Sequence, residues 1–99
     1  PQPAFLFDVA LDQRGLRVDP RHAGLEDLGR HGLHPDPSMF DRYLSLSEFE
    51  RLAEPIYDLS VERDCRYTVV VERGRHDSAR AYQEQMDAVT QRFYIYERR

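Results

Sequence analysis

The sequence predicts an α+β fold with a four-stranded sheet, two main helices, and a long loop and short-helix insertion after the first strand. Three observations lead to this prediction. Strand-like and helix-like hydrophobic patterns alternate along the chain. Two of the strand segments are apolar on both faces, which is typical of strands at the centre of a covered sheet. The chain also ends with a strand, a helix and a second strand, which together make a βαβ unit.

The first strand is predicted at residues 4–12, where apolar side chains occupy both faces and Asp8 is the one interruption. The four residues from Asp12 to Gly15 form a turn signal, because glycine can supply a positive φ. Residues 16–18 are therefore expected to fold back as a short hairpin arm.

An insertion follows the hairpin arm. Asp19 and Pro20 are a start signal for a helix, and Gly29 and Gly32 would end that helix after about two turns. Residues 30–38 contain two prolines and two histidines, and this composition predicts an irregular loop.

Ser47 and Glu50 match a capping box, which predicts a helix at residues 48–54. Pro55 is expected to break this helix. The alternation in residues 57–61 then suits a half-buried strand, and we favour that interpretation. The same residues also fit the period of a kinked helix that continues through the proline, so both alternatives stay open.

The last third of the chain is the βαβ unit. Residues 66–73 are so rich in β-branched and aromatic side chains that they predict a buried strand. Asp77 or Ser78 is expected to cap a helix over residues 79–89, which has one apolar face. Residues 92–97 alternate as a final strand. The two strands should be parallel and joined by a right-handed crossover.

The resulting order of elements is strand, helical region, strand, strand, helix and strand. This is the split β-α-β pattern of ferredoxin-like folds. The two strands that are apolar on both faces are the first and the third, which that fold places at the centre of its sheet. We therefore expect residues 1–99 to be a single ferredoxin-like α+β domain.

Composition limits the classes of function and partner. The chain has 99 residues and 40% hydrophobic content, which suits one core. Its net charge of −4 opposes general binding to nucleic acids or anionic membranes, and we expect neither as a partner.

The single cysteine, Cys65, favours a reducing compartment, and no segment resembles a signal peptide or a membrane span, so the cytoplasm is expected. Pro1 at the start, and a strand at the very end, would also suit a domain excised from a longer chain.

One loop concentrates residues of the kind that bind metals. His31, His34 and Asp36 could supply imidazole and carboxylate ligands. Gly32 and Pro35 make the segment a loop, however, so local geometry does not bring the side chains together. We favour ordinary loop residues over a metal site. No glycine-rich phosphate loop is present, and we expect no cofactor.

Asp8 is the one carboxylate inside a strand predicted to be central. A carboxylate in that position needs a partner, and Arg66 or Arg92 could form an ion pair with it. We favour this structural role over a role as a general acid or base.

The favoured function is a small, non-enzymatic protein–protein interaction or assembly module that forms a homodimer through its sheet face or its terminal strand. A four-stranded sheet with two helices on one side leaves its other face open, and aromatic side chains there would form an apolar patch. The candidate interface residues are the aromatic residues of the predicted strands: Tyr94, Tyr96, Tyr67, Phe5 and Phe7. The alternative is a cofactor-independent enzyme or small-ligand binder of the dimeric α+β barrel kind, for which the sequence identifies no catalytic residue.

Overall fold

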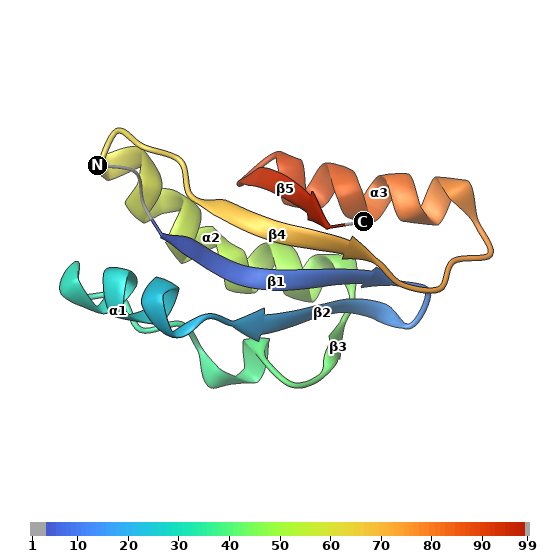
Figure 1. Ribbon diagram of the computed structural model, residues 1–99, viewed down its shortest axis with the longest axis horizontal. Helices are drawn as coiled ribbons and strands as arrows, with labels where there is room; N and C mark the ends of the chain where they lie inside the picture. Colours follow the sequence, from blue (N-terminus) through green and yellow to red (C-terminus); the bar gives the residue numbers. More distant parts are fainter. Residues whose placement is uncertain (1–3, 99) are drawn as a thin grey trace.

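The computed structural model describes residues 4–98 of the chain. These residues form five strands, three α-helices and a short 3-10 helix (Figure 1). In chain order the elements are β1 (Phe5–Asp12), β2 (Gly15–Pro20), α1 (His22–Arg30), η1 (Pro37–Met39), β3 (Tyr43–Leu44), α2 (Leu46–Glu62), β4 (Thr68–Arg73), α3 (Ala79–Thr90) and β5 (Tyr94–Arg98). The α+β class predicted from the sequence is confirmed.

All five strands belong to one mixed sheet with the order β3-β2-β1-β4-β5. Strand β2 runs antiparallel to both of its neighbours, β1 and β3. Strand β4 runs parallel to β1 on one side and to β5 on the other. The expected parallel orientation of the strands on either side of α3 is therefore confirmed, and these two strands are direct neighbours.

The ferredoxin-like assignment is not confirmed. It rested on a strand at residues 57–61, but these residues lie in the second half of α2. The sheet has five strands instead of four, because the hairpin arm β2 is a full strand and β3 pairs with its outer edge. The two strands that are apolar on both faces, β1 and β4, are interior strands of the sheet as expected, but the other strands are arranged differently around them.

Helix α2 continues through Pro55, although proline removes one intrahelical hydrogen bond at a cost of about 3 kcal/mol. The physical reason is the apolar stripe of the helix. Its buried residues are Phe49, Leu52, Ala53, Ile56 and Ser60, which follow the helical period on both sides of the proline. Breaking the helix at Pro55 would expose the second half of this stripe to water.

The capping box at the start of α2 lies two residues earlier than predicted. The Ser45 hydroxyl accepts a hydrogen bond from the backbone N–H of Glu48, and the Glu48 carboxylate accepts one from the backbone N–H of Ser45. The expected pair, Ser47 and Glu50, has the same spacing, so the sequence pattern allowed either register. At the start of α3 the prediction was right, because Ser78 is the cap.

Helices α2 and α3 cover the same face of the sheet (Figure 1). The rings of Phe49 on α2 and Phe93, just before β5, meet edge to face with centroids 6.5 Å apart. The buried residues of the sheet on this face come from β1, β2 and β4, and include Val9, Leu11, Leu16, Val18, Val69 and Val71. One hydrophobic core therefore joins both helices to the sheet.

The turn between β1 and β2 has the predicted glycine, and Gly15 adopts a φ of 138°. Cys65 lies just before β4 and is half-buried against the core. No helix within residues 4–98 is both long and apolar enough to span a membrane.

Candidate functional site

The face of the sheet that is turned away from α2 and α3 carries an aromatic patch. In the strand register Phe5 lies beside Thr68, which lies beside Tyr94, and Tyr96 lies next along β5. Tyr94 is 59% exposed, Tyr96 is 60% exposed and Phe5 is 41% exposed. The ring centroids of Phe5 and Tyr96 are 6.1 Å apart. We call Phe5, Tyr94 and Tyr96 the aromatic patch.

Charged side chains lie around the aromatic patch. The Arg21 guanidinium donates two hydrogen bonds to one oxygen of Asp8, at 3.0 and 2.8 Å, and it also lies over the Phe5 ring. Arg98 on β5 lies 3.8 Å from the same Asp8 oxygen and 3.7 Å from the Glu72 carboxylate. Acids and arginines thus alternate across this face, so the face has no strong charge of either sign.

Asp8 has a different partner from the one predicted. Neither Arg66 nor Arg92 reaches it, and Arg21 does so instead. Arg21 directly follows β2, so the hairpin returns it to the middle of β1. The expectation that the Asp8 carboxylate pairs with an arginine is confirmed, although the arginine is a different one.

Two of the predicted interface residues do not lie on this surface. Phe7 and Tyr67 are completely buried. Phe7 packs on the helix-covered side, where its ring meets Phe40 edge to face. The pairing of β1 with β4 shifts register between Phe5 and Asp8, so Phe5 and Phe7 do not share a simple alternation. The hydroxyl of the buried Tyr67 side chain accepts a hydrogen bond from the Arg63 guanidinium.

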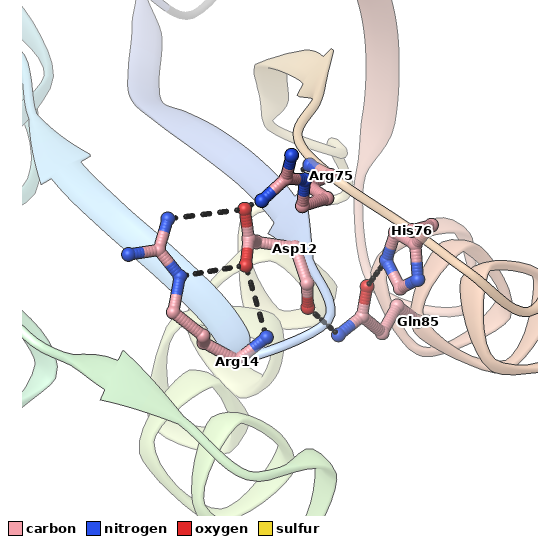
Figure 2. A network of polar contacts seen from close by, with 5 residues as sticks. All are labelled: Asp12, Arg14, Arg75, His76 and Gln85. Atoms are coloured by element: carbon pink, nitrogen blue, oxygen red, sulfur yellow. Dashed lines mark hydrogen bonds and ion pairs between the residues drawn. The ribbon is translucent and has the colours of Figure 1, made fainter.

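A second cluster lies where the carboxyl ends of β1 and β4 meet (Figure 2). The buried Asp12 carboxylate accepts hydrogen bonds from the backbone N–H and the guanidinium of Arg14, and from the backbone N–H of Arg75. Gln85 on α3 donates to the Asp12 backbone carbonyl and contacts His76 Nε2 at 2.7 Å. Because the Gln85 oxygen can only accept, His76 Nε2 is the donor in this contact.

This cluster has a structural explanation. It ties the β1–β2 turn to the loop after β4 and to α3, which lie more than 60 residues later in the sequence. The Arg14 guanidinium, together with the Arg14 and Arg75 backbone N–H groups, holds the pKa of the Asp12 carboxyl well below its usual range. An acid that is so strongly held as the carboxylate is poorly suited to proton transfer at neutral pH. The local sequence around Asp12 predicts only a turn residue and contains no signal for the distant partners Arg75 and Gln85.

The low pKa of Asp12 predicts a pH-dependent contribution to stability. Because the folded-state pKa lies below the ordinary value of 3.8, the charged carboxylate stabilises the fold above about pH 4 and loses this effect as the pH falls further. We expect Asp12→Asn to unfold at lower urea concentration than the wild type at pH 7. The difference should shrink steadily when both proteins are measured between about pH 4 and pH 2.

Asp58→Asn is the matched control, because Asp58 is exposed on α2. Its urea midpoint should follow that of the wild type at every pH. A difference between Asp12→Asn and the wild type that does not change with pH would mean that side-chain shape, and not charge, gives Asp12 its effect.

The candidate metal ligands of the histidine-containing loop have other places in the structure. His31 ends α1, and Asp36 caps η1 by accepting a hydrogen bond from the backbone N–H of Ser38 at 2.9 Å. Within residues 4–98, no three His, Cys, Asp or Glu side chains are grouped as metal ligands. His34 and Asp36 do lie together on the wall of a groove.

Comparison with known proteins does not assign the chain to a family. No family model, no curated protein and no solved structure matches it. The function is therefore argued from the chain's own residues.

Proposed function

We propose that this protein is an assembly module that forms a homodimer through the aromatic patch and the adjoining edge strand β5. The observation that carries the proposal is the exposure of three large aromatic side chains on one face. The described large apolar side chains that are exposed are Phe5, Val61, Tyr94 and Tyr96, and only Val61 lies elsewhere. Grouped apolar surface of this kind is uncommon on proteins that function as monomers.

The position of β5 also supports the proposal. It is an outer strand of the sheet, so one side of its backbone has no strand partner within residues 4–98. Unpaired edge strands readily add another strand. Strand β5 contains no proline, and its charged residues, Glu97 and Arg98, lie at its carboxyl end, after Tyr94 and Tyr96.

A second copy of the chain is the partner that suits this edge. In an antiparallel pairing of two β5 strands centred on Tyr96, the two Tyr96 rings are neighbours and Tyr94 lies opposite the Arg98 of the other copy. Aromatic–aromatic and arginine–aromatic pairs both stabilise cross-strand contacts. The mixed charges around the patch are also compatible with self-association, because like charges do not dominate either surface.

The test is the molar mass in solution, measured by light scattering over a range of concentrations. The wild type is expected to approach twice the 11.7 kDa of one chain. The double variant Tyr94→Glu/Tyr96→Glu should remain at the mass of one chain, because symmetry would bring four added negative charges together at the joint.

Val61→Glu is the control for this experiment. Val61 is as exposed as Tyr96 but lies on α2. This variant should associate as the wild type does. A wild type that stays monomeric at all concentrations, or a double variant that still dimerises, would contradict the proposal. Circular dichroism of the double variant should be unchanged, which separates loss of assembly from loss of fold.

A further inference from the structure

A groove of about 530 Å³ lies between the loop that follows α1 and one side of helix α2. The groove is separate from the aromatic patch, because none of its lining residues belongs to β1, β4 or β5. The lining residues are Leu33, His34, Pro35, Asp36, Pro37, Arg51, Leu52, Pro55 and Ile56. Its volume lies within the range of about 300–1,000 Å³ that is typical of small-molecule sites.

The floor of the groove is apolar and its walls are stiff. Leu52 and Ile56 are buried residues of α2 that face the groove, and Leu33 approaches them from the loop. Three of the lining residues are prolines, whose fixed φ angles limit the movement of both walls. An apolar ligand body would therefore bind a surface that is already formed, with little ordering of the chain.

The rim of the groove carries one positive and one negative side chain. The Arg51 guanidinium forms no ion pair with an acid of residues 4–98. It does act on Asp36, because Arg51 contributes to the lowered pKa of that carboxyl, after the hydrogen bonds from Ser38. One oxygen of Asp36 receives the Ser38 N–H, and a carboxylate can accept further donors. The rim thus offers a guanidinium donor on α2 together with a carboxylate acceptor on the loop that follows α1.

From this arrangement we infer that the groove binds a small zwitterion with an apolar side chain, of the chemical class of a free apolar amino acid. The ligand carboxylate pairs with the Arg51 guanidinium. The ligand ammonium donates to the Asp36 carboxylate. The apolar side chain rests on Leu33, Leu52 and Ile56. This site is independent of the proposed dimer interface.

The test uses three probes that differ by one charged group each: L-phenylalanine, 3-phenylpropionate, which lacks the ammonium, and phenethylamine, which lacks the carboxylate. Binding is followed by the amide shifts of the ¹⁵N-labelled protein in NMR titrations. L-Phenylalanine should shift the amides of Leu33, Leu52 and Ile56 to saturation. Each of the other probes should bind about three- to tenfold more weakly, because each loses one charge-assisted contact.

Two variants test the rim separately. Arg51→Gln should weaken L-phenylalanine about three- to tenfold, and so should Asp36→Asn, which keeps an oxygen able to cap η1. Arg80→Gln removes an exposed arginine from α3 and should leave the affinity unchanged. The amide spectra of all three variants should otherwise overlay with the wild type, which reports an intact fold.

Three outcomes would overturn the inference. The first is the absence of groove shifts with L-phenylalanine up to its solubility limit. The second is equal binding of all three probes, which would indicate contact with apolar surface alone. The third is unchanged affinity in both rim variants. None of these outcomes bears on the dimer, whose failure is detected by molar mass instead.

Discussion

Replacing Phe49 with alanine is expected to lower the free energy of unfolding by about 3–5 kcal/mol, a large part of the total for a domain of this size. Phe49 is completely buried and lies on the first half of α2. Its ring meets Phe93 in the short connection between α3 and β5, so it ties α2 to the segment that links α3 with the sheet. Alanine would leave a cavity at that junction, which the surrounding helices cannot close without leaving the sheet.

Urea denaturation followed by circular dichroism measures this effect. All proteins must be compared at one concentration, because self-association would make the midpoint depend on concentration. Val61→Ala is the matched control on the same helix, since Val61 is 60% exposed. Its stability should stay within about 0.5 kcal/mol of the wild type. If Phe49→Ala lowered the free energy of unfolding by a similarly small amount, the contact between Phe49 and Phe93 would not be important for the stability of the fold.

Replacing Gly24 with alanine is expected to destabilise the protein by about 2 kcal/mol, even though alanine is the better helix former. Gly24 lies in α1, where the helix passes directly over the start of β1. A Cβ atom at this position would lie 2.5 Å from the Leu6 Cα and 2.7 Å from the Leu6 carbonyl oxygen. These are backbone atoms of a strand inside the sheet, so α1 would have to move away.

Gly29→Ala on the same helix is expected to have the opposite sign. The nearest atom to a Cβ there is His34 Cε1 at 3.7 Å, which is an ordinary contact. Without a clash, the helix propensity of alanine should raise the stability by up to about 1 kcal/mol. Urea midpoints of the two variants therefore separate packing from propensity. If both variants shifted in the same direction, close approach of α1 to β1 would not be the reason for glycine at position 24.

Several elements were determined by the sequence alone. The β1 and β4 segments are apolar on both faces, and only a covered strand satisfies that pattern. The α3 segment combines a serine cap with one apolar face. Gly15 has the positive φ that its turn signal predicted. In each case the cause is local, because the residues that determine the conformation lie within a few positions of one another.

The exposed aromatic residues were predicted only in part, because only some of their positions depend on local sequence. Tyr94 and Tyr96 belong to a short terminal strand whose alternation is uninterrupted, so their common face followed from the period of two. Phe7 was misplaced because the register of β1 against β4 shifts between Phe5 and Asp8, and a register shift depends on the neighbouring strand.

Other features were decided only by tertiary structure. Pro55 would end an isolated helix, but burial of the apolar stripe beyond it keeps α2 continuous. Arg21 reaches Asp8, and Gln85 reaches Asp12 from 73 residues away, because strand pairing and helix packing bring them together. The sheet order likewise depends on which strands can bury their apolar faces under the same two helices. Such choices are made by contacts between distant segments, and no window of neighbouring residues contains them.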